Sequence, residues 1–221
     1  MIIGVSGYIN SGKDTIGKII QYLDSGSKAS FEKWTKSIIH CSGYDIGGES
    51  MYDCENRWKI RKFAAKVKII AGLLLNVDVE KFEDRDFKDT KLGPEWDNMT
   101  VRAFMQKLGT DAMRYGLHPD VWVNALMSEY KYTPDGLLLE NWIITDVRFP
   151  NEAQAIKDKG GFIVRVNRYP PGVSPKLMDL HESEVALDDW EFDHVIWNNG
   201  TIEDLINQIK EILRKIMPEM K

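Results

Sequence analysis

The sequence predicts an α/β fold with three layers and a five-stranded parallel sheet. Short apolar runs alternate with segments whose apolar residues recur every three or four positions, as in strands connected by helices. The 221 residues are 43% hydrophobic and 29% charged, which provides enough apolar side chains for a core of substantial size. We therefore expect a single domain over residues 1–221.

The apolar residues predict where the strands and helices lie along the sequence. Strands are expected near Ile2–Ser6, Trp58–Phe63, Trp142–Thr145, Phe162–Val166 and His194–Trp197. Helical spacing predicts helices at Lys13–Leu23, Ala64–Leu75, Val101–Tyr115, Asp120–Tyr130, Pro150–Lys159 and Ile202–Met217. Thr100 and Thr201 are typical N-caps of two of them. Residues 64–130 are therefore expected to form a helical section.

Two stretches lack this pattern. Residues 25–57 are polar and contain several glycines, so we interpret them as an insertion between the first helix and the second strand. Residues 168–179, RYPPGVSPKLMD, are rich in proline and glycine. They form either an inert connection or a mobile lid over a site.

The first predicted strand leads into GYINSGKDT, residues 7–15, which matches the phosphate-binding loop G-x-x-x-x-G-K. In such a loop the backbone N–H groups and the N-terminus of the next helix bind phosphate, and the lysine adds a positive charge. The residues expected at this phosphate site are Gly7, Asn10, Ser11, Gly12, Lys13, Asp14 and Thr15.

Position eight of the loop is Asp14, where a Mg²⁺-binding Ser or Thr is usual, and a hydroxyl follows at Thr15. Asp14 could bind Mg²⁺, because this cation prefers carboxylate oxygens. It could equally stabilise the first turn of the helix with its negative charge. Both interpretations stay open.

Further candidates follow the third strand, because ligands of parallel sheets lie at the carboxyl ends of the strands. Asp146 comes directly after this strand, where an acid can position Mg²⁺ through water, although it could also cap a loop. Arg148 could hold an anionic substrate or pair with Glu152. After the fourth strand, Arg168 could close over phosphates.

The helix predicted after Thr100 carries a polar stripe with four-residue spacing, opposite its apolar stripe: Arg102, Gln106, Thr110 and Arg114. Such a stripe is most often a solvated face. It also offers guanidinium groups for a phosphate and polar groups for a nucleotide base.

Composition excludes several other classes. The net charge of −5 argues against a nucleic-acid binder. The longest apolar stretch, Ile69–Leu75, is too short to span a membrane, and no secretory signal opens the sequence. Cys41 and Cys54 have no metal-like spacing and are expected to be free thiols of a cytoplasmic protein.

Several blocks in order resemble the deoxynucleoside monophosphate kinases of tailed bacteriophages: GYINSGKDT, LGTDAMR, DVRFPNEA, HESE and VIWNNGT. The resemblance covers most of the chain except residues 25–57. It implies a P-loop kinase fold with ATP on the loop, Mg²⁺ at Asp14 and Asp146, and a deoxynucleoside monophosphate as acceptor.

The positions after strands, the composition of residues 168–179 and the resemblance together assign roles. Lys13, Asp146, Arg148 and Arg168 would be catalytic, and residues 168–180 would form the lid. Arg102, Gln106, Thr110, Arg114 and Arg148 would bind the acceptor, within a substrate-binding section at 64–130. The partners implied are small nucleotides in the host-cell cytoplasm, with no nucleic acid and no membrane; a homodimer is compatible with the sequence.

Two other functions compete with this one. A kinase of another phosphate ester, such as phosphomevalonate kinase, shares GKD and a similar order of segments. A P-loop ATPase or switch protein is the alternative from a different class, although no Asp-Glu pair ends a strand here. The base preference and the oligomeric state do not follow from the sequence.

Overall fold

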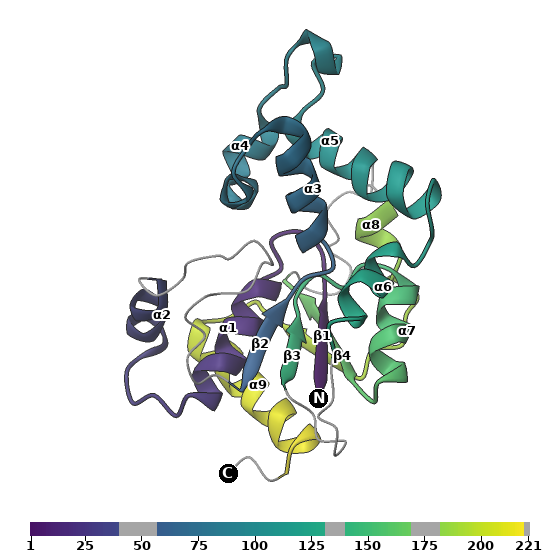
Figure 1. Cartoon of the computed structure of the whole chain (residues 1–221). Coiled ribbons are helices and arrows are strands. Elements are labelled where there is room, and N and C mark those ends of the chain that lie inside the picture. The colour runs from purple at the N-terminus through teal and green to yellow at the C-terminus, as the bar shows by residue number, and fades with distance from the viewer. Residues whose placement is uncertain (40–56, 131–139, 169–181, 219–221) are drawn as a thin grey trace. The chain divides into compact units, whose positions relative to one another are not determined.

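The structure, a computed structural model, describes residues 1–39, 57–130, 140–168 and 182–218 (Figure 1). These residues form two compact units. The first contains residues 1–39, 57–62, 130, 140–168 and 182–218, and the second contains residues 63–129.

The first unit is built on a five-stranded sheet in which every pair of neighbouring strands is parallel, as predicted. The strand order is β2-β3-β1-β4-β5. The strands are β1 (Ile2–Ser6), β2 (Trp58–Arg61), β3 (Asn141–Ile144), β4 (Phe162–Asn167) and β5 (His194–Trp197). Because β1 is central, the loop that follows it emerges in the middle of the carboxyl edge of the sheet.

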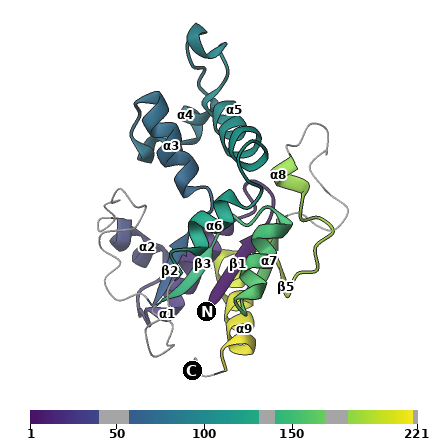
Figure 2. The ribbon, with the colours of Figure 1, turned by 45° about the vertical axis from the view of Figure 1, so that its right-hand side comes forward.

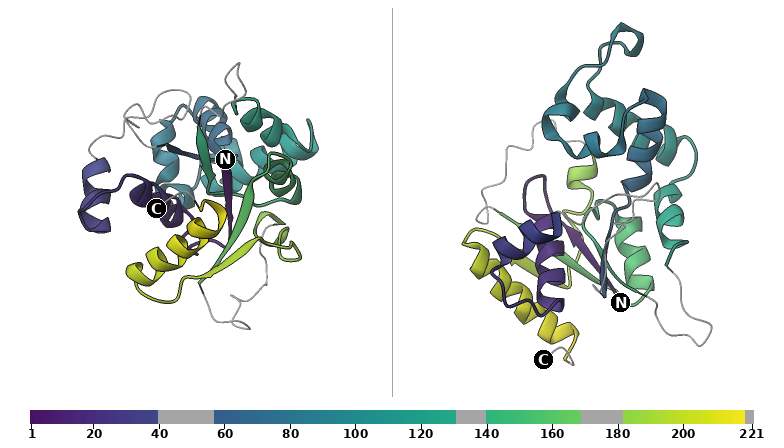
Figure 3. Two further views of the ribbon diagram at one scale, coloured as in Figure 1. Left: turned by 90° about the horizontal axis from the view of Figure 1, so that it is seen from below. Right: turned by 60° about the vertical axis from the view of Figure 1, so that its left-hand side comes forward.

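Alternating side chains of β1 face the two layers of helices. Ile3 and Val5 are buried in a core shared with α1 (Lys13–Asp24) and α9 (Ile202–Ile216). On the opposite face, a Cβ added to Gly4 would lie 2.7 Å from Cδ1 of Ile156 in α7 (Pro150–Asp158). Figure 2 shows α7 beside β1, and Figure 3 shows α1 next to α9. The predicted three layers are therefore confirmed.

Two further helices belong to this unit, α2 (Phe31–Ile39) and α8 (Glu182–Val185). The sequence did not predict α2, which lies within the stretch interpreted as an insertion. Aromatic side chains explain it: Phe31 and Trp34 lie 5.5 and 5.6 Å from Tyr22 of α1, between ring centroids. Trp34 is buried, so this part of residues 25–57 packs on the first unit.

The second unit is helical, as predicted for residues 64–130. Its elements are α3 (Ala65–Leu75), η1 (Val79–Glu83), α4 (Arg85–Asp89), η2 (Pro94–Trp96), α5 (Val101–Gln106), η3 (Lys107–Tyr115) and α6 (Val121–Met127). It has its own core around Ala71, Phe82, Val101 and Phe104. The helix predicted at Val101–Tyr115 is α-helical only in its first half, because η3 is a π-helix.

No helix of the described residues is long and apolar enough to cross a membrane.

Helix α9 provides a test of the local sequence signals. Thr201 and Asp204 form a capping box, in which the Thr201 hydroxyl accepts from the Asp204 N–H and the Asp204 carboxylate accepts from the Thr201 N–H. We expect Thr201→Ala to lower the free energy of unfolding by about 1 kcal/mol, because one helical N–H loses its acceptor. Urea unfolding measures this, and Thr201→Ser is the control that keeps the hydroxyl. Equal losses in the two variants would show that the cap contributes nothing.

Candidate functional site

The loop between β1 and α1 has the backbone that the glycines predict. Gly7 and Gly12 have φ angles of 152° and 102°, and Asn10 has a φ of 63°. A Cβ on Gly7 would lie 2.5 Å from the Val166 carbonyl oxygen, and one on Gly12 would lie 2.5 Å from Nδ2 of Asn198. A side chain at either position would therefore clash as well as strain the backbone.

Lys13 begins α1 and turns back over this loop. Its Nζ donates to the carbonyl oxygens of Gly7 and Tyr8, at 2.6 and 2.8 Å. Burial and, to a smaller extent, the positive charge of Arg148 lower the pKa of Lys13, while the negative charges of Glu184, Asp14 and Asp146 oppose them; the net result is a pKa of about 8. The charges of these residues therefore act together around one ammonium group.

Asp14 lies one residue further along α1 and is fixed by two contacts of Oδ1. Thr145, which follows β3, donates its hydroxyl at 2.7 Å, and the Lys62 ammonium lies at 3.1 Å. Desolvation alone would raise the pKa of Asp14, but the Lys62 charge and the Thr145 hydrogen bond outweigh it and keep the pKa below its usual value. The carboxylate is thus ionised and held at the end of β3. Thr15 is half buried in the same turn.

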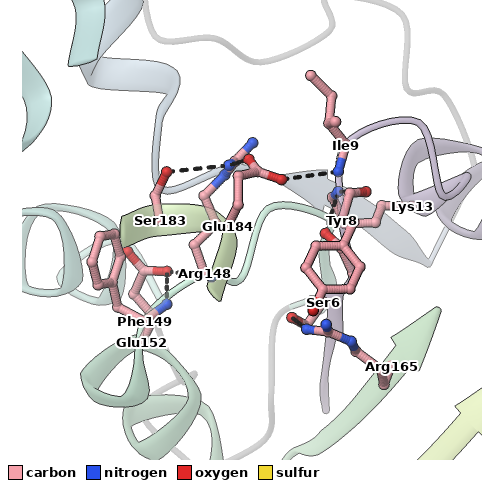
Figure 4. Close-up of polar contacts among 11 residues, drawn as sticks. Ser6, Tyr8, Ile9, Lys13, Arg148, Phe149, Glu152, Arg165, Ser183 and Glu184 are labelled. Atoms are coloured by element: carbon pink, nitrogen blue, oxygen red, sulfur yellow. Dashed lines mark hydrogen bonds and ion pairs between the residues drawn. The ribbon is translucent and has the colours of Figure 1, made fainter. Parts of the chain in front are cut away.

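Arg148 also lies beyond β3. The Glu152 carboxylate accepts from the backbone N–H groups of Arg148 and Phe149, at 2.8 and 3.1 Å. The Arg148 guanidinium forms an ion pair with Glu184 of α8, and it lies 3.5 Å from the Ser183 hydroxyl (Figure 4). Glu152 thus orders the backbone that presents Arg148.

Glu184 also reaches the loop itself, since its Oε2 accepts from the Ile9 N–H at 2.9 Å. The sequence analysis did not assign this residue. HESE was part of the family resemblance, but no rule of strand ends or spacing selects its last glutamate.

A second contact joins the loop to the chain after α8. The Tyr8 hydroxyl donates to Asp188 at 2.7 Å, and Arg165 of β4 donates to the same carboxylate at 2.9 Å. The Arg165 guanidinium lies 4.6 Å from the centre of the Tyr8 ring and 5.4 Å from that of Phe192. Arg165 is buried and contacts the loop through the Tyr8 ring.

Two further residues fix the loop backbone. Arg168, at the end of β4, donates to the Asn10 carbonyl oxygen at 3.0 Å, so it does lie next to the loop. Asn198, after β5, donates to the Ser11 carbonyl oxygen at 2.8 Å. Asn198 was missed, although the rule of strand ends that selected Asp146 applies to it equally. Arg168 is the only residue of the predicted lid that the structure describes, because residues 169–180 lie outside the described ranges.

The polar stripe of the second unit divides into two halves. In α5, Arg102 forms an ion pair with Asp89, with Nε and Oδ1 2.8 Å apart, and Gln106 is half buried. In η3, Thr110 and Arg114 are buried, at 7% and 5% exposure. Arg114 donates to the Pro119 carbonyl oxygen at 3.2 Å.

The apolar stripe that the sequence predicts opposite this one comprises Val101, Phe104, Leu108, Ala112 and Tyr115, and this prediction is wrong beyond Leu108. Ala112 and Tyr115 are exposed, and Tyr115 reaches 62% exposure, whereas the polar Thr110 and Arg114 are inside. A π-helix has wider turns than an α-helix, so the face that points inward changes along the segment. The solvated-face interpretation is therefore wrong for Thr110 and Arg114.

Comparisons with known proteins agree on one family. The model of the family "Deoxynucleotide monophosphate kinase" matches residues 75–209, more than half of the chain. A protein of Acanthamoeba polyphaga mimivirus named "Putative deoxynucleotide monophosphate kinase" is 33% identical over 154 residues, which cover 64% of this chain and 75% of the relative.

Two phage proteins are also similar. The deoxynucleotide monophosphate kinase of Enterobacteria phage T4 is 32% identical over 120 residues, 53% of this chain and 47% of the relative, so the chain spans about half of that protein. The deoxynucleoside-5'-monophosphate kinase of Escherichia phage T5 is 23% identical over 240 residues, 95% of this chain and 93% of the relative.

The sequence predicts that this loop binds phosphate, and the lowered pKa of Lys13 would make such binding depend on pH. With a pKa of about 8, Lys13 is charged below pH 8 and becomes neutral above it, whereas a bound polyphosphate favours the charged form. We expect the affinity for ATP, measured by titration calorimetry, to fall as the pH rises from about 8 to about 9.5, approaching roughly tenfold per unit. Lys13→Met should bind more weakly and lose this fall. The same slope in both proteins would contradict the assignment to Lys13.

Proposed function

Because the chain belongs to the deoxynucleotide monophosphate kinase family, we propose that it transfers the γ-phosphoryl group of ATP to the phosphate of a deoxynucleoside monophosphate. The products are ADP and a deoxynucleoside diphosphate. The observation that supports this reaction best is the loop after β1, where the charges of Arg148, Asp14 and Asp146 all act on the Lys13 ammonium group. The proposal places the enzyme with its substrates, in the cytoplasm of a host cell.

On the donor side, the loop binds the ATP phosphates through its backbone N–H groups and Lys13. The residues of this subsite are Gly7, Asn10, Ser11, Gly12, Lys13, Asp14 and Thr15. Lys13 donates to two loop carbonyl oxygens, so its ammonium lies over the loop. Binding then exchanges neutral acceptors for a phosphate, which is the stronger acceptor for an ammonium group.

Asp14 and Asp146 suit Mg²⁺, which sites of phosphoryl transfer bind through one or two carboxylates together with substrate phosphates. The Asp14 carboxylate is ionised and oriented through Oδ1 by Thr145 and Lys62, which leaves it ready to act as a ligand or to hold a ligand water. When bound, the metal ion neutralises charge on the β and γ phosphates.

On the acceptor side, we assign the polar stripe Arg102, Gln106, Thr110 and Arg114, together with Arg148. A buried arginine on a π-helix supports this choice, because π-helical turns occur frequently at functional sites. A guanidinium group offers paired donors with the geometry of a phosphate, and the Gln106 amide and the Thr110 hydroxyl can hydrogen-bond a base.

The phosphoryl transfer itself requires that the two substrates are positioned and their negative charges neutralised; it does not require a general base. The attacking group is a phosphate oxygen that is already ionised, so no residue has to remove a proton from it. The obstacle is repulsion between two polyanions, and Lys13, Arg148 and Arg168 reduce it with positive charge. Residues 168–180 are proposed as a lid that excludes water from this step.

An ADP-release assay across the common deoxynucleoside and ribonucleoside monophosphates tests the proposal. At least one deoxynucleoside monophosphate should raise the rate well above the acceptor-free rate. If only phosphomevalonate does so, the acceptor is wrong, and if none does, the protein is an ATPase or a switch.

In this assay, Lys13→Met should lower turnover by a hundredfold or more, on the order of other groups that stabilise transition-state charge. The reason is the loss of the loop's ammonium group with little change in the core. Lys18→Met is the matched control, because Lys18 is exposed on the same helix. A folded Lys13→Met enzyme with nearly normal turnover would overturn the assignment of the loop.

Arg114→Lys should weaken binding of the acceptor, the deoxynucleoside monophosphate, and leave binding of the donor, ATP, unchanged. A single ammonium group cannot replace the two parallel donors of a guanidinium, so we expect kcat/KM for the deoxynucleoside monophosphate to fall by roughly ten- to a hundredfold. The affinity for ATP without acceptor should change little. Arg85→Lys, at an exposed position of the same unit, controls for general effects. Loss of ATP binding with normal acceptor KM would place Arg114 on the donor side.

A further inference from the structure

The carboxylate of Glu184 brings together groups from two parts of the candidate site. Its Oε2 accepts from the Ile9 N–H of the loop at 2.9 Å, and its Oε1 forms an ion pair with Arg148 beyond β3 (Figure 4). The negative charge of Glu184 also acts on Lys13. One carboxylate thus interacts with a backbone N–H, a guanidinium group and an ammonium group.

These are the three kinds of group that bind a phosphate of a nucleotide. Backbone N–H groups of the loop, the loop lysine and an arginine all favour a negatively charged oxygen. Without a negatively charged group between them, the charges of Lys13 and Arg148 would repel each other. The effect is visible in the pKa of Lys13, which the Arg148 charge lowers. Glu184 supplies the compensating negative charge from within the chain.

Glu184 is also held in place by its surroundings. Its side chain is only 12% exposed. Four residues further along, Asp188 accepts from the Tyr8 hydroxyl and from Arg165, which joins the same segment to the loop a second time. The carboxylate therefore belongs to a segment attached to the loop at two points.

We infer that Glu184 is an internal competitor of the nucleotide phosphates, which must displace its carboxylate from Ile9 and Arg148 before the loop is filled. This inference rests on the proposed function, since it assumes that the ligand is a nucleoside triphosphate. Its consequence is that Glu184 lowers the affinity for ATP: part of the binding free energy is used to break its two contacts.

Glu184→Gln tests the inference. The amide oxygen can still accept from Ile9, but the ion pair with Arg148 is lost, so less has to be displaced. We expect the Kd for the β,γ-imido analogue of ATP, measured with Mg²⁺ and no acceptor, to fall by about three- to tenfold, the range of one net interaction of this kind. Glu182→Gln makes the same chemical change on the same helix at an exposed position and should have a much smaller effect.

The role of Arg148 is tested by combining substitutions. In an Arg148→Met background, Glu184→Gln should improve the affinity far less, because the contact that it weakens is already gone. An undiminished gain there would contradict competition for Arg148.

A purely structural role of Glu184 gives the opposite result. Glu184→Gln would then lower the thermal stability and leave the affinity unchanged or weaker, which overturns the inference. Failure of the proposed function looks different, because no deoxynucleoside monophosphate would then raise the rate of ADP release, whatever Glu184→Gln does to the Kd. A wild-type protein that binds no ATP analogue would overturn both proposals together.

Discussion

Hydrogen bonds from outside the loop hold the backbone of residues 7–12, and the candidate site depends on them. Asn198 donates to the Ser11 carbonyl oxygen, Arg168 donates to that of Asn10, and the Ile9 N–H donates to Glu184. Asn198 follows β5, Arg168 follows β4, and Glu184 lies in α8. Since a parallel sheet gathers the carboxyl ends of its strands at one edge, chain segments far apart in sequence can contact the same short loop.

Charge is the second constraint on this region. Lys13, Arg148 and Arg168 would repel one another if they faced a site without anions. Instead, Arg148 pairs with Glu184, and both Lys13 and Arg168 donate to backbone carbonyl oxygens of the loop. Each cation thus has an acceptor from its own chain, and each of these contacts is one that a phosphate can replace. These internal acceptors would allow the site to fold without the phosphate that we propose as its ligand.

Much of the first unit followed from local patterns in the sequence. Each strand was placed within a few residues, because the strands are short apolar runs bounded by glycine or polar residues. The loop was recognised because strain and close approach require glycine at positions 7 and 12. Asp146, Arg148 and Arg168 were selected because they follow strands. The ligand roles of these residues are still predictions.

The parts that were missed depend on contacts between distant residues. Helix α2 has apolar residues at helical spacing, Phe31, Trp34 and Ile38, but it lies in a polar stretch with several glycines. The packing of Phe31 and Trp34 against Tyr22 of α1 shows that it belongs to the first unit. The contact of Glu184 with Ile9 joins residues 175 positions apart, and no local rule predicts it.

The second unit shows where periodicity misleads. Its sequence between 101 and 115 fits an α-helix, yet the apolar positions of an α-helix would bury Ala112 and Tyr115, and these are exposed. In the structure, α5 contributes Val101 and Phe104 to the core, and after Gln106 the wider turns of η3 bring Thr110 and Arg114 inside instead. The indole N–H of Trp122 donates to the Gly109 carbonyl oxygen at 2.8 Å, within this segment. The four-residue spacing of the polar stripe lies between the period of an α-helix and that of a π-helix, so it did not distinguish the two. Burying a guanidinium group costs free energy that an apolar residue would not require, and this cost is the reason why we propose an anion-binding role for Arg114.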